Sequence, residues 1–182
     1  MFSMHPLEVI EKYYPRNSTA YRVLVTHSQM VMQLALRIVD KHPELNADRA
    51  FVMEAAMLHD IGIRFTHAPS IGCHGDFPYI CHGYLGHDVL INEGLPLHAR
   101  VCERHTGTGI TLEDIASQGL PLPHRNMLPE TIEEQIICFA DKFYSKGERT
   151  LQLSPEQVRN GLKKYGTDKI KTFNRWMKKF EF

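Results

Sequence analysis

The chain has 182 residues, of which 43% are hydrophobic, and its formal net charge is zero because 21 Lys and Arg balance 21 Asp and Glu. A chain of this length can bury a core without disulfides or a structural metal, so a single domain over residues 1–182 is expected. No apolar run approaches the roughly 20 residues of a membrane helix, and the first residues lack a secretory pattern. We therefore expect a cytoplasmic protein with no membrane partner.

Helical periodicity dominates the chain, and no alternating run is long enough to predict a strand, so the expected fold class is all-α. Helices are predicted over 6–13 and 18–41, each ending ahead of a proline. Asn46 is predicted to cap a third helix, which continues to about Asp60 and ends at Gly62 in a left-handed turn.

The chain after Gly62 is predicted to be helical apart from two long loops. These loops cover 62–81 and 118–129, which are rich in glycine and proline. Thr131 and Glu134 form a capping box, which is typical of a helix start. The remaining predicted helices cover 82–93, 96–105, a short stretch from Thr111, 131–146, and the basic region 154–180, which is expected to pack on a core of about 18–146.

The cysteines and the uneven charge give only weak functional signals. The four cysteines fit no close-spaced disulfide framework, so reduced thiols are expected. A zinc site at Cys73-His74 and Cys81-His82 is the alternative, but no CxxC knuckle supports it. Residues 142–182 contain eleven Lys or Arg and four Asp or Glu. We interpret this run as a solvated helical face, with a phosphate-attracting rim as the alternative, and it is not dense enough to indicate nucleic-acid binding. Oligomer formation stays open.

Five helices or helix ends each carry a ligand-type side chain on their apolar face. His27, for example, lies at helical spacing from Leu24 and Val31 and is expected to point into the core. For any one histidine alone, a core histidine bonded to a backbone carbonyl is the more common case. The other four residues are His59, His82, His105 and Asp141.

The aspartates favour a metal centre. A buried carboxylate is costly unless it is paired, and the 131–146 helix offers Asp141 no Lys or Arg three or four residues away on its core-facing side. A divalent cation would remove that cost, and imidazole with carboxylate suits iron, manganese, cobalt, nickel or zinc. Adjacent helical residues point about 100° apart, so His59 and Asp60 can share a site only if their helix ends near Asp60. There Asp60 could also bridge a second ion.

These residues, in this order, resemble the H, HD, D signature of the HD-domain superfamily in its HDIG form. The resemblance rests on His27, on the run from His59 to Gly62 and on Asp141, and it spans about residues 20–146. The segments MLHDIG, ERHTGTGI and PETIEEQIICFADK look like those of small stand-alone HDIG proteins of bacteria and archaea, which are predicted hydrolases.

The resemblance implies an all-α HD-domain helical bundle with a site for one or two divalent ions. His87 is a rival of His82, but the two lie five positions apart and cannot face the same way on a helix. Four other histidines are interpreted as surface residues, although His74 could reach the pocket from its loop. These four are His67, His74, His98 and His124. The implied ligands are His27, His59, Asp60 and Asp141 for one ion and Asp60, His82 and His105 for the second.

Departures from other HD enzymes narrow the expected function. The chain has HTGTGI where the HD enzymes that cleave cyclic di-GMP have a double histidine and a GYP motif, so the dipeptide Gly83-Tyr84 is a coincidence. The dNTP triphosphohydrolases are much longer, and the mononuclear HD nucleotidases lack the intermediate histidines. A cyclic dinucleotide or a triphosphate is therefore less expected as the substrate.

The resemblance favours a metal-dependent phosphohydrolase that cleaves a phosphomonoester or phosphodiester of a small molecule, with nucleotides among the candidates. Asp60 is predicted to orient the attacking water, and Lys142 and Arg64 are predicted to neutralise phosphate charge. Both have a structural alternative, since Lys142 points away from Asp141 on a helix and Arg64 could cap a helix end. The rims of the pocket are expected to come from 62–81 and 106–129.

Two other classes of function stay open. A few HD proteins with the same six ligands are mixed-valence diiron oxygenases that act on small molecules, and ligand identity alone does not exclude this alternative. A degenerate HD domain that only binds a ligand would lack one of the six residues, and none is missing from this sequence.

Overall fold

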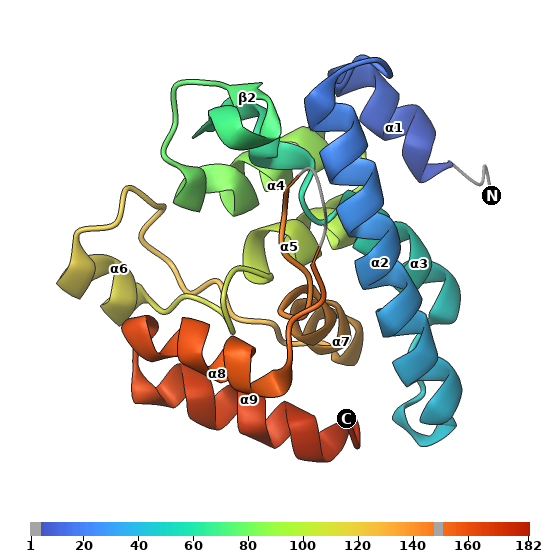
Figure 1. The fold of residues 1–182 in the computed structure, drawn as a ribbon, viewed down its shortest axis with the longest axis vertical. Coiled ribbons are helices and arrows are strands. Elements are labelled where there is room, and N and C mark those ends of the chain that lie inside the picture. The colour runs from blue at the N-terminus through green and yellow to red at the C-terminus, as the bar shows by residue number, and fades with distance from the viewer. Residues whose placement is uncertain (1–4, 148–150) are drawn as a thin grey trace.

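The computed structural model describes residues 5–147 and 151–182, and nearly all of its regular structure is helical (Figure 1), which confirms the predicted fold class. The α-helices are α1 (Pro6–Tyr13), α2 (Thr19–Lys41), α3 (Arg49–Leu58), α4 (His82–Asn92), α5 (Pro96–Arg104), α6 (Leu112–Gln118), α7 (Ile132–Asp141), α8 (Pro155–Leu162) and α9 (Thr167–Lys179). Short 3-10 helices lie between them: η1 (Pro43–Leu45), η2 (Ile61–Phe65), η3 (Pro69–Ile71), η4 (Tyr79–Cys81) and η5 (Lys163–Tyr165). The predicted 62–81 loop also contains an antiparallel pair of two-residue strands, β1 (His67–Ala68) and β2 (Cys73–His74).

Several helices start where the capping residues of the sequence indicate. Thr131 opens α7 with a capping box, in which its side chain accepts from the backbone N–H of Glu134 and the Glu134 side chain accepts from the N–H of Thr131. First-turn N–H groups have no partner inside a helix, and such a cap stabilises the helix by about 1 kcal/mol. The same reciprocal pairs open α6 and α8, at Thr111 with Asp114 and at Ser154 with Gln157.

The predicted start of α3 and the predicted end of α7 are wrong. The cap of α3 is Asp48, while Asn46 closes η1 with a left-handed backbone at φ 50°. Helix α7 ends at Asp141 rather than at 146, because the chain turns there and pairs with a later segment: the N–H of Leu153 donates to the carbonyl of Phe143 at 2.8 Å. Phe143 is fully buried, so part of the apolar pattern that looked helical belongs to this paired segment.

Most buried apolar side chains form two neighbouring groups, and the long helix α2 contributes to both. A smaller third group includes Ile115 of α6. One group lies among α1, α2, α3, η2, α4 and α5, and the other among α2, α3, α7, α8 and α9. In the second group, the rings of Phe139 in α7 and Phe173 in α9 stack with centroids 5.5 Å apart. Aromatic packing therefore holds α9 against α7, and α8 lies beside α9 (Figure 1).

The described residues test two further expectations, which concern membrane helices and the cysteines. No helix among them is long and apolar enough to cross a membrane. All four cysteines are free, as expected, and all four are buried. No group of three or more metal-ligand side chains in the described ranges includes a cysteine, so the zinc alternative has no structural support there.

Candidate metal centre

The six predicted metal ligands come from five different segments and lie together inside the helical bundle. Their ligand atoms form two groups that share Asp60, and within each group these atoms lie within 4.8 Å of one another. None of the six residues is more than 6% exposed. The first group contains His27, His59, Asp60 and Asp141, and the second contains Asp60, His82 and His105.

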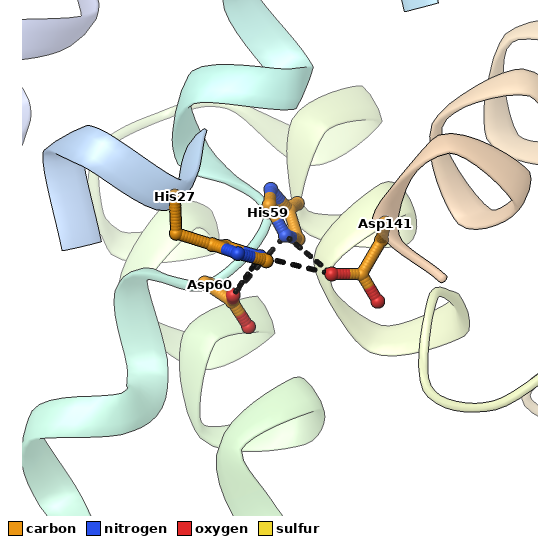
Figure 2. Close-up of side chains that lie close together, drawn as sticks. All are labelled: His27, His59, Asp60 and Asp141. Atoms are coloured by element: carbon orange, nitrogen blue, oxygen red, sulfur yellow. Dashed lines mark hydrogen bonds and ion pairs between the residues drawn. The ribbon is translucent and has the colours of Figure 1, made fainter. Parts of the chain in front are cut away.

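In the first group, two histidines face two carboxylates. The Nε2 atom of His27 lies 2.9 Å from Oδ1 of Asp141 and 3.2 Å from Oδ2 of Asp60. The Nε2 atom of His59 lies 3.1 Å from the same oxygen of Asp60 and 3.4 Å from the same oxygen of Asp141. Figure 2 shows these four side chains pointing toward one another from α2, from the end of α3 and from α7.

In the second group, the other carboxylate oxygen of Asp60 faces two histidines. This oxygen, Oδ1, lies 3.2 Å from Nε2 of His105 and 3.5 Å from Nε2 of His82. The two Nε2 atoms lie 3.1 Å from each other. Asp60 thus directs one oxygen to each group, which is the arrangement of a bridging ligand.

Three of the four histidines are oriented by the same kind of backbone contact. The Nδ1 atoms of His59, His82 and His105 each lie 2.6 or 2.7 Å from the carbonyl oxygen of the residue three positions earlier. A carbonyl oxygen can only accept, so each Nδ1 carries the proton and donates it, and in the neutral ring Nε2 presents its lone pair to the centre. Metal-bound histidines are commonly fixed in this way.

His59 and Asp60 reach one centre because α3 ends before them. Its last residue is Leu58, and the backbone then tightens into η2. The predicted left-handed turn at Gly62 is wrong, since Gly62 lies within η2 and its φ is not positive. Its role is a close approach: a Cβ at this position would lie 2.1 Å from the carbonyl oxygen of His82, so glycine lets η2 pack directly on α4.

Two lysines that follow α7 reach the carboxylates. The Nζ atom of Lys146 lies 2.8 Å from Oδ2 of Asp60 and 3.5 Å from Oδ1 of Asp141, and Nζ of Lys142 lies 2.7 Å from Oδ2 of Asp141. Burial alone would raise the pKa of both carboxyls, but the lysines hold both pKa values well below the usual range. No Lys or Arg lies three or four residues from Asp141 in the sequence, but the prediction of a helix that continues to 146 is wrong. The chain turns after Asp141, and both lysines therefore reach its carboxylate.

The histidines of the two groups differ in protonation. Burial lowers the pKa of His82 to about 3 and also lowers the pKa of His105, despite the carboxylate of Asp60 beside them. Burial opposes protonation of His59 as well, but Asp60 and Asp141 outweigh it and raise the pKa of His59 to about 9. The second group therefore presents two neutral ring nitrogens and one carboxylate oxygen.

The chemistry of these donors fits a divalent metal. The Nε2 atom of His59 and both carboxylate oxygens of Asp60 are buried and make no directed hydrogen bond within the described residues. Polar atoms buried in this way are costly unless they are paired. Histidine nitrogen combined with carboxylate oxygen is a ligand mix of divalent transition metals, so a bound ion would coordinate these atoms, whereas without an ion the Asp60 carboxylate is paired with Lys146.

A cavity of about 320 Å³ lies next to the metal centre and is lined by Asp141. Lys142 and Lys146 line it as well, and the Thr106–Ile110 segment forms another part of its wall. Of the predicted rim 62–81, only Ile80 is among the described residues that line it. Lys146 is the candidate that sequence reasoning missed, because five positions after Asp141 it would face another side of a continuous helix.

The other predicted phosphate-binding residue lies elsewhere. Arg64 is exposed and its guanidinium packs over the rings of Tyr14 and Phe65. It is not among the described residues that line the cavity beside Asp141, so the structure gives no support for its predicted role. Arg64 lines a separate depression on the surface.

The histidines that are predicted to lie on the surface are exposed, with the exception of His98. His98 is only 9% exposed, its ring packs edge-on against Phe51, and its Nε2 lies 3.2 Å from the carboxylate of Glu54. The prediction failed because α3 covers this side of α5, which periodicity within α5 does not reveal. His87, the rival of His82, pairs with the exposed Asp88. The exposed histidines are His67, His74 and His124.

Comparison with curated proteins finds archaeal relatives. Two are named tRNA (cytidine(56)-2′-O)-methyltransferase. The one from Picrophilus torridus is 34% identical over 131 residues, covering 71% of this chain and 34% of the relative. The one from Thermoplasma volcanium is 34% identical over 146 residues, covering 80% of this chain and 38% of the relative. An uncharacterized protein of Methanocaldococcus jannaschii is 36% identical over 115 residues, covering 63% of this chain and 59% of the relative.

The chain spans little more than a third of the length of the two relatives named as methyltransferases. No solved structure gives a significant match. A family model described as HD domain matches residues 24–145, a range that contains all six candidate ligands from His27 to Asp141. The chain therefore belongs to the HD-domain family.

Proposed function

We propose that this chain is a metal-dependent phosphohydrolase that cleaves a phosphomonoester or phosphodiester of a small molecule. The observation that carries the proposal is the position of Asp60, whose two carboxylate oxygens face separate groups of histidine nitrogens 3.1 to 3.5 Å away. The lysine-lined cavity beside the same centre supports a substrate that carries phosphate.

The residues of the centre would hold one or two divalent ions, with iron, manganese, cobalt, nickel and zinc as the candidates. An ion of this kind lowers the pKa of a bound water and draws charge from phosphoryl oxygens. Membership of the HD-domain family and the buried donors support this assignment. The first ion would bind to His27, His59, Asp60 and Asp141, and the second to Asp60, His82 and His105.

The side chains around the centre would position the reacting groups. Asp60 would accept a hydrogen bond from the attacking water and so fix its orientation. Lys142 and Lys146 would neutralise charge on the phosphate oxygens, because both line the cavity beside Asp141. Without metal their ammonium groups are paired with Asp60 and Asp141, and they can turn toward a phosphate once those carboxylates are otherwise neutralised.

The names of two relatives add tRNA to the substrates that should be tested. Those names describe 2′-O-methylation of a tRNA cytidine, but this chain spans little more than a third of either relative. The centre in this chain is built from metal ligands, so we propose hydrolysis rather than methyl transfer. Transfer RNA enters the assay as a phosphodiester substrate.

Elemental analysis of the purified protein, followed by assays of the same sample, tests the proposal. The assays use phosphomonoesters, phosphodiesters, nucleotides and tRNA. We expect up to two equivalents of a divalent transition metal and measurable ester hydrolysis. Asp60→Asn keeps the shape of the side chain but removes its charge, and it should lower turnover by about 100-fold or more. His124→Ala changes an exposed histidine and should have no effect.

The diiron oxygenase alternative predicts a different result from the same sample. It requires two equivalents of iron, a mixed-valence signal and consumption of oxygen. That combination, without hydrolysis of any phosphate ester, would replace the phosphohydrolase proposal.

A further inference from the structure

The cavity beside the metal centre is larger than a phosphate group needs. Its volume of about 320 Å³ lies at the lower end of the range for small-molecule sites, about 300–1,000 Å³. Asp141, Lys142 and Lys146 line the part next to the metal centre, and residues of α6, α8, η5 and α9 line much of the remainder. There is therefore room for an organic group attached to the phosphate.

The C-terminal helices form part of this wall, although they lie outside the range 24–145 that matches the HD-domain family. Val158 and Leu162 of α8 line the cavity and are buried, and Tyr165 of η5 adds an aromatic ring. Figure 1 shows α8 and α9 next to each other and close to α6. An ion pair between Lys169 of α9 and Asp114 of α6 ties the two elements together, so Lys169 adds no unpaired charge to the wall.

One buried polar group in the wall, the hydroxyl of Thr108, has no partner among the described residues. Thr108 lines the cavity and is only 4% exposed, and its hydroxyl makes no hydrogen bond within the described residues. A buried hydroxyl without a partner is costly, and a polar atom of a bound molecule would remove this cost. The wall thus combines apolar surface with a buried hydroxyl that has no partner, and polar side chains such as Gln118, Gln157 and Lys164 line other parts of it.

We propose that this cavity holds the organic part of the substrate, and that α8 and η5 select phosphomonoesters with an apolar, ring-sized body. The inference rests on the proposed function, which places the phosphate at the metal centre. Apolar surface on Val158, Leu162 and Tyr165 favours a body that gains free energy from burial. A body rich in hydroxyls, such as a sugar, would leave the polar groups that face these three side chains without partners.

Gly161 of α8 provides a direct test of this inference. It lines the cavity, and a Cβ at this position would meet no atom within 4 Å. A side chain introduced here therefore starts in open space, and it also replaces a poor helix former. Asn160 precedes it on the same helix, is exposed and is not among the described residues that line the cavity. Asn160→Phe is thus the matched control for Gly161→Phe.

Calorimetric titration of the metal-loaded protein with methylphosphonate and benzylphosphonate measures how much the organic group of the ligand contributes to its affinity. Both probes carry the same charged group, and their C–P bond resists hydrolysis. Burial of the phenyl ring predicts that benzylphosphonate binds about 10- to 100-fold more tightly than methylphosphonate. Gly161→Phe and the smaller Gly161→Leu should remove most of this preference and leave methylphosphonate binding unchanged, whereas Asn160→Phe should retain the preference.

The possible results separate the inference from the function on which it rests. Equal affinities for the two probes in the unmodified protein, or a preference that survives both Gly161 variants, would overturn the inference and leave the phosphohydrolase proposal intact. Loss of methylphosphonate binding in both variants would also overturn it, because Gly161 would then contact the phosphate site. If neither probe binds to the metal-loaded protein, the proposed function fails and the inference fails with it.

Discussion

The Nε2 atoms of His82 and His105 lie 3.1 Å apart inside the helical bundle. Each ring donates its Nδ1 proton to a backbone carbonyl, and burial keeps both rings neutral, so two lone pairs face each other. Two hydrogen-bond acceptors at this distance repel each other unless a positive charge lies nearby. This pair, together with Oδ1 of Asp60, is best explained as the ligand set of a cation.

Replacement of His82 by Ala is expected to halve the metal content, from two ions per chain to one, because the second group would keep only Asp60 and His105. Mass spectrometry of metals in protein reconstituted with excess manganese or iron measures this change. His87→Ala is the control, since His87 is paired with the exposed Asp88 and belongs to neither group. A His82→Ala protein that still bound two ions would contradict the dinuclear assignment.

Lys146 is predicted to stabilise the metal-free protein and to matter less once metal is bound. Its side chain is only 16% exposed and pairs with the buried carboxylate of Asp60. Loss of one partner from a buried ion pair costs about 3–5 kcal/mol, and somewhat less is expected here because Lys142 remains beside Asp141. In urea denaturation, Lys146→Met should therefore lower the midpoint of chelator-treated protein far more than the midpoint of metal-loaded protein.

The control for this experiment is Lys178→Met, which changes an exposed lysine of α9 and should alter stability by no more than about 0.5 kcal/mol. An equal loss of stability by Lys146→Met with and without metal would contradict the prediction. It would show that Lys146 stabilises the fold to the same extent whether or not a metal ion neutralises the carboxylates.

Helical periodicity makes residues within a helix predictable from sequence. His27 lies in the middle of α2, and Leu24 and Val31 on the same stripe are buried beside it. Helical periodicity predicts the direction of a side chain less well at the end of a helix. His105 follows the last residue of α5. Of the two apolar residues at helical spacing before it, Val101 is buried but Leu97 is 60% exposed. The apolar pattern of α5 therefore indicates the inward direction of His105 only in part.

Features that depend on contacts between elements could not be predicted. Lys146 reaches Asp60 because the chain leaves the helical path after Asp141, and His98 is buried because α3 packs on it. Periodicity gives the direction of a side chain on its own helix, but it does not show which neighbouring element covers that side chain. The role of Gly62 belongs to the same class, since it depends on the close approach of α4.

Gly62→Ala is predicted to destabilise the protein and to reduce its metal content. The new Cβ would lie 2.1 Å from the carbonyl oxygen of His82 and 2.4 Å from the backbone nitrogen of Gly86. Backbone atoms cannot move aside without separating η2 from α4, so a loss of about 3 kcal/mol or more is expected in chemical denaturation. Because Asp60 and His82 lie on opposite sides of this contact, metal binding should weaken as well.

Gly161→Ala is the matched control, because its Cβ would enter open space within α8. Replacement of a helical glycine at such a position should stabilise the protein by about 0.5–1 kcal/mol. Similar denaturation midpoints for Gly62→Ala and Gly161→Ala would contradict the close packing of η2 on α4.

The four thiols are predicted to react slowly in the folded protein. Burial raises the pKa of Cys73 to about 11 and the pKa of Cys138 to about 12. At pH 8 an ordinary thiol with a pKa of about 8.5 is about one quarter thiolate, whereas Cys73 would be about one part in a thousand. Because the thiolate is the nucleophile, labelling by iodoacetamide should be slow at pH 8 and should rise about tenfold per pH unit below the pKa.

Mass spectrometry after unfolding in guanidinium, without a reductant, completes this test. All four cysteines should then be labelled, because all four are free and only burial protects them. Labelling of two or fewer would reveal disulfides that the structure does not contain. Rapid labelling of Cys138 in the folded protein would show that the segment between α5 and α7, whose carbonyls at His105 and Gly107 accept from the Cys138 thiol, opens readily. Since that segment also carries His105, such opening would weaken the metal centre itself.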